Sequence, residues 1–269
     1  MAKDRFKREK THDTKMKTVI LRLDYSGVAD SAELVRWFDK RFPSAFKERI
    51  EHHNREFNIQ LRKEDIETIS KTLSLPVSVI ARETIMRYHR MKDVNCEVTL
   101  DISKYYLCMT LKCDNNYDGL DNYVSCFKGA ITTFKDNVPY FCPRRLGLRK
   151  VRVESKPSMR DFDNIFEEHV YKIPSYGFDN SSFLATDYVD CFEISNLNNL
   201  RFNVRGKMDY VKGEAGEMEY KSTLDIDAYY QSDALANANI NEWLMSANLK
   251  AFDVYKYCMK ESYLETISE

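Results

Sequence analysis

One order of predicted elements occurs twice along this 269-residue chain, and that order constrains the fold more than any other feature. Apolar and polar residues alternate over 18–25, which predicts a strand with one face in a core. A helix over 30–42 follows, then three strands at 84–91, 96–102 and 105–113, and an amphipathic helix at 118–134. The first unit is therefore strand, helix, three strands, long helix.

The second unit begins in PRRLGLRKVRVES, residues 143–155, where Leu146, Leu148 and Lys150 alternate with Gly147 and Val151. After it we expect a short helix at 160–166, strands at 183–194, 200–211 and 217–230, and a final long helix at 237–267. We predict an α+β fold of two tandem copies of strand, helix, three strands and long helix. The antiparallel sheets are expected to be covered by helices on one face.

The predicted units define the domain organisation. Residues 1–17 are rich in cations and have almost no large apolar side chain, so we expect a mobile basic tail. The first repeat spans 18–140 and contains a helical insertion at about 43–80, in which His52 and His53 belong to a charged, solvated helix. The second repeat spans 141–269.

The charge balance argues against a protein that is generally basic or acidic. The formal net charge is -1, but residues 1–92 hold 21 Lys and Arg against 14 Asp and Glu. The whole chain therefore has no electrostatic reason to seek nucleic acid or a membrane. The basic N-terminal part and the acidic C-terminal part are expected to attract each other, or one of them meets a partner.

The cysteines indicate reduced thiols. Their number is odd, seven, and they are scattered without a paired framework or a preceding apolar signal segment, so we predict a cytoplasmic protein. No apolar run approaches the roughly 20 residues of a membrane-spanning helix. Zinc would prefer two close cysteine pairs, and no phosphate-cradling glycine-rich loop is present, so we predict neither a metal nor a cofactor.

Five cations in the 143–155 segment form a candidate binding site: Arg144, Arg145, Arg149, Lys150 and Arg152. We expect most of them to face water. Arg149 is predicted to pair with a carboxylate and so tie the two repeats together, because a buried arginine needs an acidic partner. Binding of phosphate or nucleic acid by the whole cluster is the alternative.

A second candidate site imitates a metal-dependent nuclease. Asp209, followed by Glu219 and Lys221, has the pattern in which two carboxylates hold Mg²⁺ and a lysine assists the attacking water. The spacing is loose, and a solvated strand face with cross-strand ion pairs explains the same residues. Asp225 and Asp227 alternate with apolar residues and are interpreted in the same structural way.

The segment 61–90 leaves two structures open. Its pattern suits a DNA-reading helix-turn-helix with Ser74 in the turn and Ser78, Arg82 and Arg87 positioned to contact DNA. The alternative is a structural insertion whose last part is a strand of the first sheet.

Several motifs resemble a sporadically distributed family of uncharacterised prokaryotic proteins, and the resemblance spans nearly the whole chain. The family has an aromatic residue at the start of the mid-chain helix, a Leu-Gly-Leu-Arg block and a terminal amphipathic helix. The matching positions here are Tyr117, Leu146, Gly147, Leu148, Arg149, Val151, Leu244 and Phe252. Lys150, Arg152 and Met245 replace the family's Tyr, Asn and His. The resemblance implies an association with mobile-element and defence genes.

From these features we expect a non-enzymatic component that binds another protein or assembles with itself, in a mobile-element or antiphage system. Abundant Tyr and Phe leave aromatic side chains for interfaces, and sheet edges can pair with an extended peptide. A nucleic-acid-binding regulator that uses the basic N-terminal third and the arginine cluster is an alternative. A metal-dependent nuclease is the second.

Overall fold

A computed structural model describes residues 2–12, 14–28, 32–41, 46–53, 63–74, 76, 81–90, 97–113, 119–170, 185–213 and 216–268. Its α-helices are α1 (Ala32–Arg41), α2 (Lys63–Leu73), α4 (Asp121–Asn137), α5 (Ile240–Cys258) and α6 (Glu261–Thr266). The strands are β1 (Met16–Ser26), β2 (Phe46–His53), β3 (Ala81–Arg90), β4 (Glu97–Ile102), β5 (Tyr106–Lys112), β6 (Cys142–Lys156), β7 (Ala185–Ile194), β8 (Leu200–Lys212) and β9 (Met218–Tyr230). Short 3-10 helices are η1 (Ala2–Arg5), η2 (Arg8–Lys10), η4 (Met159–Asn164), η5 (Ser195–Leu197) and η6 (Asp233–Asn237).

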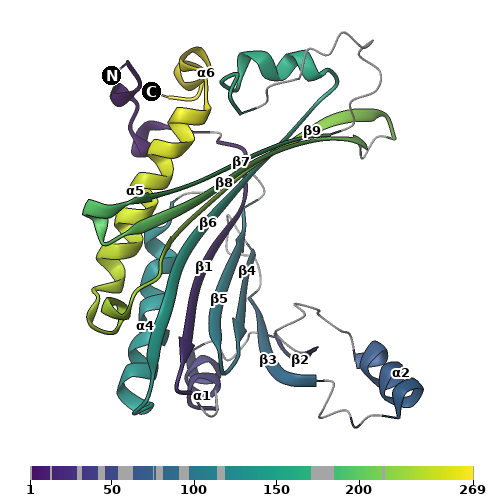
Figure 1. Ribbon diagram of the computed structural model, residues 1–269, viewed down its shortest axis with the longest axis vertical. Coiled ribbons are helices and arrows are strands. Elements are labelled where there is room, and N and C mark those ends of the chain that lie inside the picture. Colours follow the sequence, from purple (N-terminus) through teal and green to yellow (C-terminus); the bar gives the residue numbers. More distant parts are fainter. Residues whose placement is uncertain are drawn as a thin grey trace.

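The chain has an α+β fold built around one large antiparallel sheet (Figure 1). Over the described residues its nine strands follow the order β2-β3-β4-β5-β1-β6-β9-β8-β7. β1 and β6 lie side by side at the centre, where Leu21 is opposite Leu148 and Leu23 is opposite Leu146. The sheet twists strongly, so that β7 and β8 run across the view in which β1 and β5 run along it.

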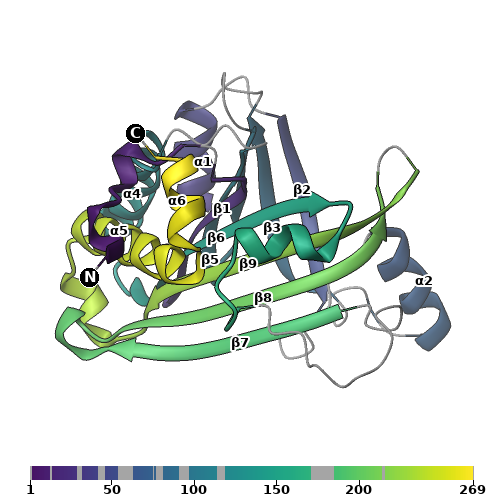
Figure 2. The same ribbon diagram turned by 90° about the horizontal axis from the view of Figure 1, so that it is seen from above.

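The core lies between one face of this sheet and the helices α4 and α5 (Figures 1 and 2). Alternation along β1 puts Leu21, Leu23 and Tyr25 on the helix side, where each is at most 2% exposed. The Tyr25 ring lies 4.9 Å from the ring of Phe134 of α4, and its hydroxyl donates to the Ser103 carbonyl at 2.6 Å. Each large side chain buried in this way contributes about 1.5–3 kcal/mol to folding.

The N-terminal segment differs from the expected mobile tail. Residues 2–12 include η1 and η2 and lie against the C-terminal helices (Figure 2). Lys3 pairs with Glu167 at 2.5 Å, Arg5 pairs with Glu261 at 2.7 Å, and Phe6 is 6% exposed. The attraction between basic N-terminal and acidic C-terminal parts therefore acts within the molecule and holds the segment in place.

The region after α1 contains a strand that the sequence did not reveal. Residues 46–53 were expected to be helical, but they form β2, which pairs antiparallel with β3. An edge strand is stabilised by backbone hydrogen bonds on one side, so a highly charged sequence such as FKERIEHH is compatible with it. The expected helical insertion is thus only partly helical, with α2 as its described helix.

The helix-turn-helix interpretation of 61–90 is wrong. α2 ends at Leu73 and Ser74 follows with a φ of +54°, but residues 81–90 form β3, which pairs with both β2 and β4. Arg87 lies on this strand and binds Asp101 through two hydrogen bonds of 2.6 and 2.8 Å. Ser78 lies outside the described residues, and the described residues 81–90 form a strand where the second, DNA-reading helix was expected.

The end of the chain is two helices instead of one. α5 stops at Cys258, and α6 begins at Glu261, because Met259 adopts an extended conformation and forms a β-bridge with Phe166.

Within the described part of the chain, no helix combines the length and the apolar character needed to cross a membrane.

Candidate functional site

The five cations of β6 do not form one patch. Arg145 and Arg149 lie on the sheet face opposite α4 and α5, here called the open face, whereas Lys150 and Arg152 lie on the helix-covered face at 7% and 1% exposure. Arg144 is exposed and donates to Ser26 and Asp233 at 3.0 and 3.2 Å. The expectation that most of the cluster faces water therefore fails for its two most C-terminal members.

On the open face, Arg149 is paired with a carboxylate. Its Nε and Nη2 atoms donate to Asp225, at 2.8 and 2.5 Å, and this hydrogen bonding raises the pKa of Arg149. Asp225 belongs to β9, so this pair joins two strands of the same half and does not tie the halves together. Two other members of the cluster contact the first half of the chain: Arg144 donates to Ser26 of β1 at 3.0 Å, and Arg145 lies 3.9 Å from Asp24 of the same strand.

The shorter ion pair of Arg145 is with β9 and not with β1. It donates to Asp227 of β9 at 2.7 Å and lies over the Tyr229 ring, 4.4 Å from the ring centre. Burial raises the pKa of Asp227, although Arg145 opposes that shift. Gly147 makes room for this arrangement, because a β-carbon there would be 3.0 Å from the Arg145 guanidinium.

Arginine and carboxylate alternate across the rest of the open face. Arg22 pairs with Asp24 at 2.9 Å, and Arg201 pairs with Glu193 at 2.7 Å. A hollow of about 320 Å³ lies among Arg22, Arg145 and Arg149. A phosphate-binding surface needs an excess of cations, and here the central arginines already have carboxylate partners.

The nuclease candidates lie toward the hairpin that joins β8 and β9. Asp209 is opposite Lys221 in the strand register, and Val211 is opposite Glu219. The carboxylate of Asp209 binds Lys207 at 2.7 Å, an ion pair within β8 and not the cross-strand pair that was expected. Among the residues that the structure describes, no group of three or more His, Cys, Asp or Glu side chains could hold a metal ion.

The helix-covered face holds ionic groups whose burial the sequence did not predict. Arg152 binds Glu154, whose side chain is 8% exposed, and also donates to the Tyr263 hydroxyl at 3.0 Å. Burial, together with the charge of Arg8, lowers the pKa of Lys150 to about 7. The alternation of the strand could have predicted this burial. Lys150 and Arg152 lie on the same face of β6 as Leu146 and Leu148, which were expected to be buried.

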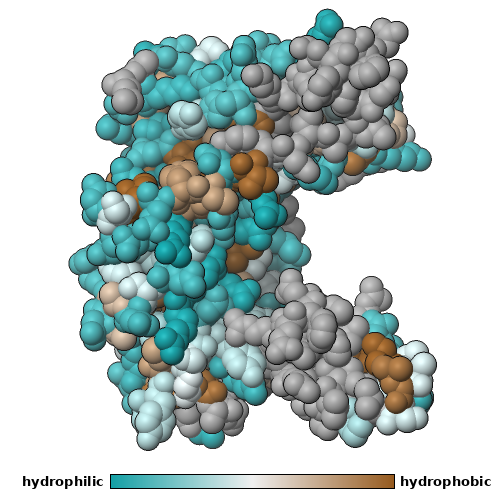
Figure 3. All heavy atoms as spheres, viewed as in Figure 1, coloured by the Kyte–Doolittle hydropathy of each residue, from teal (hydrophilic) through white to brown (hydrophobic). Residues whose placement is uncertain are grey.

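β7 forms one edge of the sheet, and among the strands that the structure describes it pairs with β8 alone. Its sequence, ATDYVDCFEI, contains three acids and no cation. Val189 is 60% exposed and Phe192 is 36% exposed, although the Phe192 ring stacks on Phe202 at 4.9 Å. Most of the described surface visible in Figure 3 is hydrophilic with small hydrophobic patches. Apolar side chains on an edge strand are therefore a candidate interaction site.

Comparison of the sequence with protein-family models and with curated proteins finds no match. The candidate site is accordingly defined by its geometry.

Proposed function

We propose that the protein is a non-enzymatic interaction component that binds an extended segment of a partner protein along β7. The observation that carries this proposal is a ten-residue edge strand with exposed apolar side chains, at the end of a nine-stranded sheet. The outer side of such a strand presents backbone donors and acceptors to an added strand, and side-chain contacts supply specificity.

The charge of β7 favours a different protein over a second copy of this chain. Asp187, Asp190 and Glu193 are its only charged residues. In an antiparallel pair of two β7 strands, acids would meet acids in several registers, and like charges directly opposite each other are destabilising. The preferred partner is therefore an extended segment that combines apolar residues with Lys or Arg.

The scaffold behind this edge is proposed to be a tandem duplication. β1 and β6 are neighbours at the centre; β5, β4 and β3 continue the sheet on one side, and β9, β8 and β7 continue it on the other. In each half a long helix, α4 or α5, follows the third of these outer strands along the chain. This correspondence supports two repeats, with β2 and α2 as additions to the first.

The cellular context is also a proposal. The odd cysteine count favours a reducing compartment, so we place the protein in the cytoplasm. The resemblance described above is what supports our proposal of a mobile-element or antiphage system.

The two alternative functions have weaker support. For a nucleic-acid-binding regulator, Arg145 and Arg149 would have to exchange their carboxylate partners for phosphates, and Lys3 and Arg5 already bind acidic residues. For a nuclease, the carboxylate of Asp209 is bound to a lysine. A steep loss of affinity with salt would support the first alternative, and Mg²⁺-dependent cleavage lost in Glu219→Ala would support the second.

The test is a tagged pull-down from the native host, with nuclease treatment, of the wild-type chain and of Val189→Lys. A lysine on an edge strand opposes strand addition, and Val189 is exposed enough to accept it without disturbing the core. Leu249→Lys is the control, because Leu249 is 52% exposed on α5 and away from the edge. We expect a stoichiometric protein partner that Val189→Lys loses and Leu249→Lys keeps. A partner kept by both variants, or nucleic acid alone, would overturn the proposal.

A further inference from the structure

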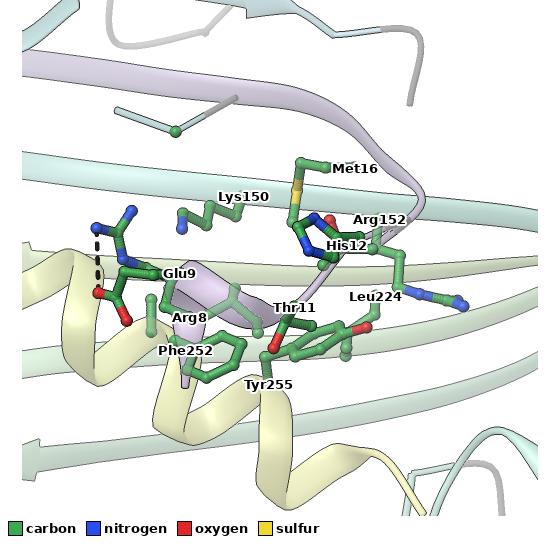
Figure 4. Close-up of a pocket in the computed structure, with 14 residues that line it drawn as sticks. Arg8, Glu9, Thr11, His12, Met16, Lys150, Arg152, Leu224, Phe252 and Tyr255 are labelled. Carbon is green, nitrogen blue, oxygen red and sulfur yellow. Dashed lines mark ion pairs between the residues drawn. The ribbon is translucent and has the colours of Figure 1, made fainter. Parts of the chain in front are cut away.

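A cavity of about 430 Å³ lies between the helix-covered face of the sheet and α5 (Figure 4). Lys150 and Arg152 of β6 line one side of it, and Phe252 and Tyr255 of α5 line the other. The N-terminal segment around Arg8 covers it. The volume falls within the range of small-molecule sites in proteins.

Basic side chains outnumber acidic ones in the lining. Arg8, Lys150 and Arg152 belong to it, whereas Glu9 is the one carboxylate among the described lining residues. The Glu9 side chain is 67% exposed and lies 3.6 Å from Arg8. Lys150 is 7% exposed, so its ammonium group carries a desolvation cost that an anion in the cavity would offset.

The direction of the pKa shift agrees with this geometry. Burial is the main cause that lowers the pKa of Lys150 to about 7, and the positive charge of Arg8 adds to it, while Cys113 acts in the opposite direction. A negatively charged group placed beside Lys150 would counter both lowering effects.

The two ends of the cavity differ in their polar groups. In Figure 4 the Lys150 side chain extends toward Arg8, and the Arg152 guanidinium extends away from it, with Tyr255 below. The Nε and Nη1 atoms of Arg152 and the Tyr255 hydroxyl are buried and form no hydrogen bond with a described residue. Buried polar groups are costly to leave without hydrogen bonds, so this end of the cavity favours a ligand atom that can accept them.

Apolar side chains also line the cavity. Leu224 and Ile226 of β9 and the Phe252 ring of α5 line it. These side chains suit a hydrocarbon or aromatic body and would gain free energy by excluding water around it.

We propose that this cavity is a binding site for a small organic anion with an apolar body, whose acidic group lies beside Lys150. The site is separate from the proposed partner-binding edge, because no residue of β7 lines the cavity. Lys150 provides the charge recognition, and Phe252, Leu224 and Ile226 contact the body of the ligand.

The test uses calorimetric titration with hexanoate, octanoate and decanoate and with the alcohols of the same chain lengths. A charge-assisted contact contributes about 1.5–3 kcal/mol, so the wild-type chain should bind at least one acid roughly tenfold more tightly than its alcohol. Lys150→Met keeps the length of the side chain and removes its charge, and it should abolish that preference while leaving alcohol binding in place. Lys221→Met, on the open face, is the matched control and should keep it.

Two results would overturn the proposal. One is the absence of saturable binding of every acid by the wild-type chain. The other is an acid preference that survives in Lys150→Met, because the charge would then be recognised elsewhere. Urea unfolding of each variant verifies that it is folded.

Discussion

Glu154→Gln should strongly destabilise the protein, because it removes the carboxylate partner of a buried arginine. The Arg152 and Glu154 side chains are 1% and 8% exposed. After the substitution, Arg152 would retain its hydrogen bond to the Tyr263 hydroxyl, while its Nε and Nη1 atoms already have no partner among the described residues. Breaking a buried pair in this way costs about 3–5 kcal/mol. Glutamine keeps an acceptor oxygen, so we expect a loss of about 3 kcal/mol.

The matched comparison is Asp225→Asn, which breaks the pair with Arg149 on the open face. The Arg149 side chain is 49% exposed, so this loss should be about 1 kcal/mol or less. Urea unfolding followed by circular dichroism gives both values. Equal losses would refute the reasoning, since burial would then make no difference to the strength of the pair. The double variant Arg152→Met/Glu154→Met should recover part of the loss, because it leaves no charge buried alone.

Three further predictions concern pH, thiol reactivity and backbone conformation. The pKa of Lys150 falls from 10.5 to about 7 on folding, so the unfolded chain binds more protons between these values and stability should rise with pH above 7. The slope is up to about 1.4 kcal/mol per pH unit, and urea titrations of Lys150→Met should lack it. Iodoacetamide should alkylate exposed Cys191 well before buried Cys258, whose pKa burial raises to about 12, and equal rates in a mass-spectrometric time course would contradict this. Gly27→Ala should destabilise more than Gly216→Ala in thermal unfolding: both have positive φ, but a β-carbon at Gly27 would lie 1.7 Å from a carbonyl oxygen, against a nearest atom at 3.7 Å for Gly216.

The sequence predicted the second half of the fold well. Strands expected at 183–194, 200–211 and 217–230 correspond to β7, β8 and β9. The last two alternate buried and more exposed residues over most of their length and are separated by a glycine-containing turn. Gly216 has the positive φ that this turn requires. Where one face of a strand is buried, the alternation of apolar and polar residues predicts the strand directly.

Elements that owe their structure to distant partners were not predictable in the same way. β2 is a charged strand that pairs with β3, and the N-terminal segment is ordered by contacts with residues more than 150 positions away, such as Lys3 with Glu167. Composition alone indicates solvent exposure for both. The tertiary partners decide the outcome, and they are not visible in a local pattern.

The candidate site was predicted in part. The Arg149 pair with a carboxylate occurs, but its partner is in the same half of the chain. Lys150 and Arg152 were grouped with the arginines by charge, although their strand parity places them with Leu146 and Leu148.

The central claim is that a partner strand adds to β7, and backbone hydrogen exchange tests it most directly. The affinity-purified complex and the free protein would be compared by hydrogen–deuterium exchange and mass spectrometry. Strand addition predicts slower exchange over 185–194 in the complex, with no change over the opposite edge strand at 46–53. A bound partner that leaves exchange over 185–194 unchanged would contradict the account.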